Sequence, residues 1–195
     1  GNQPQFQSLP WFYHPLVNGN PRHPITKNNP PVRFRFANQI DTLENSIKKT
    51  PLLVSSPLTR KIGTPNFIEL QSIADEPKEA QYQGGYQLFG VLLEGEFNSM
   101  YANRIKPADT QNFRDKSAAN KMIVISDGDI VKNQIAKNQP YDLSVDKWTG
   151  ERFGNKEFLL NSIDYLLDDT GLIDLRNKTL QINLLDKQRA YEDRG

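Results

Sequence analysis

The stretch KMIVISDGDIV, residues 121–131, decides the fold expected for this chain of 195 residues. Residues 121–126 form a short apolar run, which is typical of a strand buried on both faces. Asp127, Gly128 and Asp129 follow it with turn chemistry, because Asp side chains accept hydrogen bonds from nearby backbone N–H groups and Gly tolerates unusual φ angles. We therefore expect a buried strand, an acidic turn and then a short helix over residues 130–138.

A longer helix is predicted from residue 155 onward. Apolar residues recur at helical spacing between Phe158 and Leu167, so that one face of the helix is apolar. Asn155 is a suitable N-cap residue and Gly171 is suitable for ending the helix. This pattern predicts a helix that packs one side against a hydrophobic core.

Other apolar runs, at residues 51–56 and 87–94, indicate two more buried strands. Residues 32–36 alternate apolar and basic side chains, as in an edge strand with one buried face. Long polar connections separate these runs, and at least one helix is expected to pack between the strands. This arrangement predicts an α/β fold, a three-layer sandwich with a largely parallel sheet.

The prolines divide the chain into three regions. Residues 1–31 hold seven of the 13 prolines, which predicts an extended arm anchored by the aromatic residues 11–13. Residues 32–171 are expected to form the α/β core, and residues 172–195 an extended segment that packs on the core or leaves it. Because the chain begins with Gly and without a leader pattern, we expect a fragment whose targeting or membrane segments lie elsewhere.

Composition limits the classes of partner. The 24 Lys and Arg and the 23 Asp and Glu leave a net charge of +1, which creates no overall field to attract nucleic acid or an anionic membrane. We therefore predict no nucleic-acid partner, and any partner must be recognised locally. The chain has no Cys, which excludes disulfides, thiolate metal sites and a cysteine nucleophile.

The acidic turn also has a catalytic interpretation. An apolar strand followed by Asp-x-Asp-x-Val opens phosphatases of the haloacid-dehalogenase type, in which one Asp attacks phosphorus and the other transfers protons beside Mg²⁺. Those enzymes need a Ser or Thr and a Lys after this strand, whereas Ser55 and Ser56 precede it. The order disfavours catalysis, and a Mg²⁺-dependent phosphohydrolase using Asp127 and Asp129 remains the alternative hypothesis.

Polar residues near the ends of the predicted strands form a candidate binding rim. The carboxyl ends of parallel strands meet at one edge of a sheet, where open α/β folds bind ligands. We predict no catalytic residue, no metal site and no cofactor. The rim residues are Ser55, Ser56, Arg60, Glu94, Arg104, Asp127, Asp129 and Asn133.

Several segments together resemble the GldG-like auxiliary family of gliding-motility ABC transporters. The resemblance covers most of the chain, and its most specific part combines the Asp-Gly-Asp turn with the FGNKEF helix start. The segments that carry it are PWFYHPLV (10–17), HPIT (23–26), LLVSS (52–56), VLLEGEFNS (91–99), KMIVISDGDI (121–130), FGNKEFLLNSIDYLLDD (153–169), GLI (171–173) and LRNK (175–178).

The resemblance implies a function as well as a fold. It implies a non-catalytic subunit, similar to flavodoxin-like or class I glutamine-amidotransferase-like domains without their catalytic residues. Such a subunit would lie on the periplasmic face of the inner membrane, held by transmembrane segments outside this chain, beside a permease and an ATPase. A glycan-binding module, with Trp11, Tyr13 and Trp148 as stacking surfaces, is a further alternative.

Overall fold

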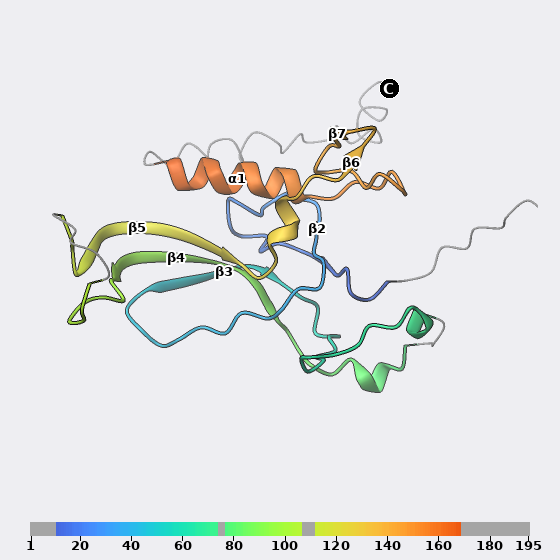
Figure 1. Ribbon diagram of the computed structural model, residues 1–195, viewed down its shortest axis with the longest axis horizontal. Coiled ribbons are helices and arrows are strands. Elements are labelled where there is room, and N and C mark those ends of the chain that lie inside the picture. Colours follow the sequence, from blue (N-terminus) through green and yellow to red (C-terminus); the bar gives the residue numbers. More distant parts are fainter. Residues whose placement is uncertain (1–10, 74–76, 107–111, 169–195) are drawn as a thin grey trace, which may run out of the picture.

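The computed structural model describes residues 11–73, 77–106 and 112–168. A three-stranded sheet forms its centre, in the order β3 (Lys48–Val54), β4 (Leu88–Asn98) and β5 (Lys116–Ile125) (Figure 1). Both pairs of neighbouring strands are antiparallel. All three apolar runs predicted as strands therefore lie in one sheet, in chain order.

The predicted three-layer sandwich with a largely parallel sheet is wrong. The described residues pair in small antiparallel sheets, and α1 (Asn155–Leu167) is the one α-helix among them. Parallel neighbours need a crossover connection, usually a helix. The chain between β3 and β4 instead contains Pro57, Pro65 and several glycines and forms only short 3-10 turns in its described part.

Smaller elements surround the sheet. β1 (Leu16–Val17) pairs with β2 (Val32–Arg33), and β6 (Ile135–Ala136) pairs with β7 (Gln139–Pro140). The 3-10 turns are η1 (Leu70–Ile73), η2 (Glu79–Gln81) and η3 (Gly128–Val131).

The helix predicted over residues 130–138 is wrong as well. Only η3 forms there, and the β6–β7 hairpin follows it. Lys137 and Asn138 at the hairpin turn have φ of 49° and 60°. Two successive positive φ angles are the backbone of a type I′ turn, whose twist matches that of the paired strands.

The longer helix is present, but its contacts differ from the predicted apolar face. α1 begins at Asn155 and ends before Asp168, so the N-cap is Gly154 and the predicted N-cap Asn155 is the first helical residue. The predicted terminator Gly171 lies outside the described residues. Phe158 and Ser162 are buried, whereas the neighbouring apolar residues Leu160, Ile163 and Leu167 are exposed among the described residues.

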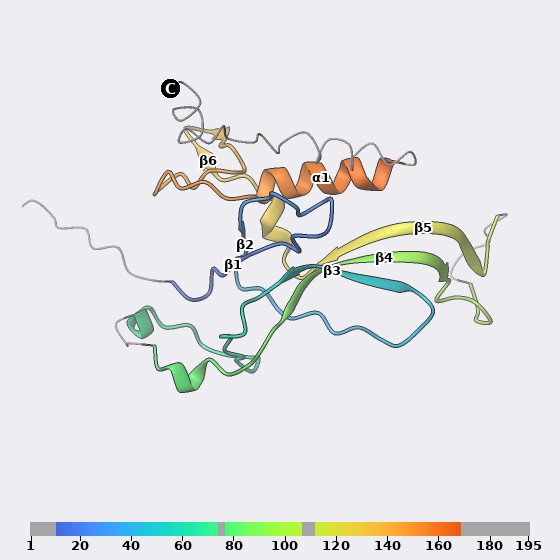
Figure 2. The same ribbon diagram turned by 180° about the vertical axis from the view of Figure 1, so that it is seen from behind.

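The core lies between the sheet, α1 and the segment 11–37, which passes between them in both views (Figures 1 and 2). Val17 and Ile25, from the segment predicted as a proline-rich arm, are fully buried there. Burying a large aliphatic side chain contributes roughly 1.5–3 kcal/mol, so this segment stabilises the fold. The buried core residues are Val17, Ile25, Val32, Phe34, Leu52, Leu53, Phe89, Leu92, Ile130 and Phe158.

In the described ranges, no helix has the combination of length and apolar character that crossing a membrane requires.

Candidate functional site

The Asp127 carboxylate joins the acidic turn to the segment after β2. Its Oδ2 atom accepts a hydrogen bond of 2.6 Å from the backbone N–H of Arg35, and its Oδ1 atom accepts one of 2.8 Å from Asp129 N–H. The second bond makes Asp127 the side-chain cap of η3. Both carboxylate oxygens thus accept hydrogen bonds from backbone N–H groups, as those of a capping Asp do.

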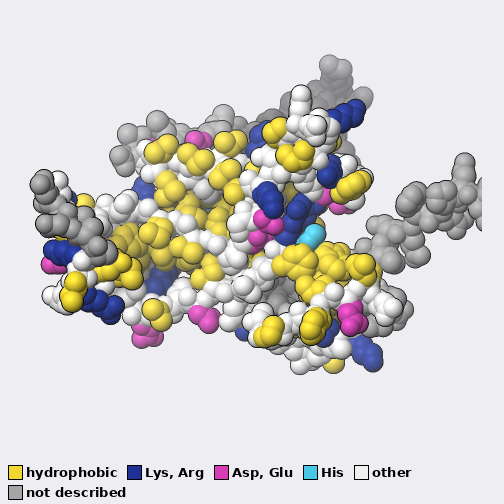
Figure 3. Space-filling model, in the orientation of Figure 1, with side chains coloured by type: hydrophobic (Ala, Val, Ile, Leu, Met, Phe, Trp, Pro, Cys, Tyr) yellow, Lys and Arg dark blue, Asp and Glu magenta, His cyan; other side chains and the backbone are white. Residues whose placement is uncertain are grey.

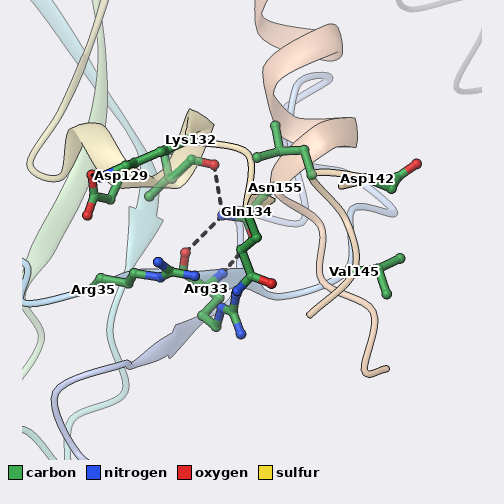
Figure 4. Close-up of a pocket in the computed structure, with 10 residues that line it drawn as sticks. Arg33, Arg35, Asp129, Lys132, Gln134, Asp142, Val145 and Asn155 are labelled. Carbon is green, nitrogen blue, oxygen red and sulfur yellow. Dashed lines mark hydrogen bonds and ion pairs between the residues drawn. The ribbon is translucent and has the colours of Figure 1, made fainter. Parts of the chain in front are cut away.

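Asn155, the first residue of α1, bridges the same region from the other side (Figure 4). Its Oδ1 atom accepts from Arg33 N–H at 2.9 Å, and its Nδ2 atom donates to the carbonyls of Arg33 at 2.9 Å and Ile130 at 3.1 Å. The side chain is buried. One amide of α1 therefore satisfies three backbone groups, two of them in β2 and one in η3.

Gly154 allows the helix start to approach the preceding chain closely. A Cβ atom at this position would lie 2.1 Å from the Pro30 carbonyl oxygen. Gly154 N–H donates to the Pro31 carbonyl at 2.8 Å, and Asn29 Nδ2 donates to the Gly154 carbonyl at 3.1 Å. The Gly154-Asn155 pair of the family-like segment therefore has a structural explanation.

Asp146 organises the loop beside this site. Its Oδ2 atom pairs with Arg33 Nη1 at 2.5 Å and accepts from Gln134 Nε2 at 3.0 Å, while its Oδ1 atom accepts from the backbone N–H groups of Trp148 and Thr149. Burial opposes ionisation of Asp146, but these donors outweigh it and hold its pKa well below the usual range.

These elements enclose a small pocket lined by segment 33–35, η3 and the loop around Asp142 (Figure 4). On its rim, Lys132 Nζ lies 3.6 Å from Asp129 Oδ1. Arg35 is half-buried, and its guanidinium makes no hydrogen bond or ion pair within the described ranges. Figure 3 shows basic and acidic side chains side by side on this face, next to an apolar area. Such a surface suits local recognition of a polar group.

The structure places the predicted rim residues in two groups. At the end of the sheet where β3 and β5 finish, Asp127, Asp129 and Asn133 lie around η3. Ser55, Ser56 and Arg60 follow β3 at the same end. There Ser55 Oγ accepts from Gln87 N–H at 2.8 Å, Arg60 Nη1 lies 3.4 Å from Gln81 Oε1, and Asn133 Nδ2 donates to the Tyr141 carbonyl at 2.7 Å.

Glu94 and Arg104 lie toward the other end of the sheet. β4 runs opposite to its neighbours, so its carboxyl end points away from Ser55 and Asp127. Glu94 faces Lys48 at 2.8 Å and accepts from the Tyr165 hydroxyl at 3.2 Å. The Lys48 hydrogen bond is the main cause that lowers the pKa of Glu94. Eight predicted rim residues therefore do not form one rim.

The aromatic residues considered for glycan stacking differ in exposure. Trp11 and Tyr13 are half-buried and pack together at 5.2 Å, and Tyr13 stacks on Phe36 at 5.6 Å. Burial, followed by the positive charges of Arg35 and Arg33, lowers the pKa of the adjacent His14. Trp148 is 83% exposed. Two of the three rings are thus mainly occupied by contacts within the chain.

Sequence reasoning missed the roles of Arg33, Gln134, Asp146 and the Asn155 side chain. Asp146 did carry a usable pattern, since an Asp that caps backbone N–H groups two and three residues later is a common turn. No sequence pattern indicated the long-range hydrogen bonds of the Asn155 side chain. In the described part of the chain, no group of three or more His, Asp or Glu side chains is arranged to hold a metal ion.

The geometry defines a small domain whose polar residues mainly connect backbone segments. Residues 1–162 match the family described as "ABC-type uncharacterized transport system", and the chain belongs to that family. The predicted resemblance to ABC-transporter auxiliary proteins is thereby confirmed. No curated protein and no solved structure matched the chain.

Proposed function

We propose that this domain is a non-catalytic binding or assembly subunit of a gliding-motility-type ABC transport system. In this proposal it works beside the permease and the ATPase on the periplasmic face of the inner membrane, where transmembrane segments outside this chain hold it. The observation that carries the proposal is membership of the transport-system family over residues 1–162.

The use of the acidic turn supports a non-catalytic role. A nucleophilic carboxylate must present an oxygen to the substrate, but both oxygens of Asp127 accept backbone hydrogen bonds. Asp129 lies at the surface beside Lys132. An assay with p-nitrophenyl phosphate and Mg²⁺ tests this part, and turnover that disappears in the Asp129→Asn variant would establish the phosphohydrolase alternative.

The surface around η3 is the part of the predicted rim that we propose for assembly. It combines the exposed Asp129–Lys132 pair with Arg35, which lines the same pocket, and with Asn133, which follows Lys132 in the chain. Charged groups at the edge of an interface mainly set partner choice and orientation. A partner that recognises these charges should bind less well when the acidic and basic positions are exchanged.

Co-purification from native membranes tests the assembly role. The double variant Asp129→Lys, Lys132→Asp retains an i,i+3 ion pair but reverses its direction, so the fold is expected to survive. We expect the permease and ATPase to copurify with the unmodified protein and to be depleted with the double variant. Glu96→Gln is the matched control, because Glu96 forms a surface ion pair with Lys116 on the sheet, away from η3. Failure of the unmodified protein to copurify with either subunit would refute the proposal.

A further inference from the structure

Residues 134–152, here named the Trp148 tip, display an exposed tryptophan on two firmly connected loops. Trp148 N–H donates to Asp146 Oδ1 at 2.9 Å, and Gln134 Nε2 donates to Asp146 Oδ2 at 3.0 Å. Gln134 Oε1 in turn accepts from Lys147 N–H at 2.7 Å. These bonds fix the backbone of the loop at Trp148, and the residue itself is 83% exposed.

Apolar and cationic side chains lie together on the tip. Ile135 is 55% exposed and Tyr141 is 36% exposed. Lys147 Nζ lies 4.9 Å from the centre of the Trp148 ring and donates to the Ile135 carbonyl at 3.0 Å. Lys147 thus connects the two loops, and Lys137 occupies the exposed turn of the β6–β7 hairpin.

The acids of the tip are largely engaged by partners outside it. Asp146 pairs with Arg33, and Asp142 pairs with Lys156 at 2.9 Å. Glu151 is exposed and remains to offset the cations. Lys137, Lys147 and Arg152, exposed on the same segment, outnumber it.

We propose that the Trp148 tip makes a shallow contact with an anionic lipid bilayer. Amphipathic aromatic rings favour the headgroup region, and lysines beside them are attracted to anionic lipids. A glycan site would need free polar groups around the ring, yet Asp146 and Gln134 are bonded internally. Three apolar side chains are also few for a stable protein interface, which buries roughly 1,200–2,000 Å².

This proposal rests on the proposed function in one respect, which is that the domain lies close to a membrane. One small contact would be weak alone, but a domain already held at the bilayer meets it at high effective concentration. Lipid binding by the isolated chain is independent of copurification with the permease, so each can fail separately.

Vesicle binding tests the contact. The chain has two tryptophans, so Trp11→Phe leaves Trp148 as the sole tryptophan. Emission and co-sedimentation are measured with vesicles of phosphatidylcholine alone and of phosphatidylcholine mixed with phosphatidylglycerol. We expect a blue shift and co-sedimentation with the anionic vesicles, both weakened by high salt because the charge attraction is screened.

Variants in the unmodified background locate the binding residues, with circular dichroism as the check on folding. Trp148→Ala should abolish most vesicle binding, and Lys147→Gln should weaken it about fivefold. Phe67→Ala is the matched control, because Phe67 is 93% exposed outside the tip. No binding to anionic vesicles, or equal loss in the Phe67 control, overturns the proposal. It is likewise overturned if Trp148→Ala depletes the copurified permease but leaves vesicle binding unchanged, which would indicate a protein contact.

Discussion

Replacing Asn155 by Ala should destabilise the domain strongly, although the substitution removes only a small amide. The amide makes three hydrogen bonds, to Arg33 N–H, the Arg33 carbonyl and the Ile130 carbonyl. Each contributes about 1 kcal/mol net, and a buried backbone group left unpaired costs about 1–3 kcal/mol. Better helix propensity of Ala returns less than about 0.7 kcal/mol. We expect a loss of roughly 2–4 kcal/mol in the free energy of unfolding.

Urea unfolding followed by circular dichroism measures this loss. Asn161→Ala is the matched control on the same helix. Among the described residues, the Asn161 side chain makes one hydrogen bond, to the Ile25 carbonyl at 3.1 Å, so the variant should lose about 1 kcal/mol or less. Asn155→Asp sharpens the test. An Asp in the first turn normally favours a helix, but here its carboxylate would face the Arg33 and Ile130 carbonyls. If Asn155→Ala or Asn155→Asp is as stable as the unmodified protein, the bridging role is refuted.

Three further predictions concern single polar side chains. Asp127→Asn should lower the free energy of unfolding by about 1.5–3 kcal/mol, because one charge-assisted bond to backbone N–H is lost. The control Asp129→Ala should change the free energy of unfolding by less than about 0.5 kcal/mol. Equal effects of the two variants in urea unfolding would contradict the capping role. Ser162→Ala should leave stability unchanged or raise it, because the buried Ser162 Oγ has no hydrogen-bond partner among the described residues; a loss above about 1 kcal/mol in the same assay would count against this. Asp146 should make the fold acid-sensitive: its folded pKa lies below the unfolded value, so its contribution is present above about pH 4 and lost as the pH falls. Unfolding midpoints measured from pH 6 to about pH 2 should fall less steeply in Asp146→Asn, and identical slopes would reject this assignment.

Local features were predictable because they depend on neighbouring residues. The apolar runs that became β3, β4 and β5 were visible as strands, and the helical spacing after Asn155 indicated α1. The Asp-Gly-Asp sequence indicated a capped turn, which the Asp127–Asp129 bond forms. The family resemblance was also contained in the sequence, and the family match over residues 1–162 confirms it.

Strand direction, by contrast, was decided by the tertiary structure. A buried apolar run has the same sequence pattern whether the neighbouring strand is parallel or antiparallel. The parallel sheet was therefore inferred only from the spacing of the apolar runs and the long connections between them. Because β4 runs against β3 and β5, Glu94 lies away from Ser55 and Asp127. A single candidate rim was therefore predicted from correct strand positions combined with a wrong direction.

The sequence by itself determined the positions of β3, β4, β5, the Asp127 turn and α1, and the family to which the chain belongs, since those depend on local patterns. Only the tertiary structure decided what the polar residues do. Asn155 bonds to Arg33 across 122 positions of the chain, and Asp146 pairs with the same residue across 113. No local pattern specifies such pairs, because they arise when β2, η3 and α1 pack together around the core.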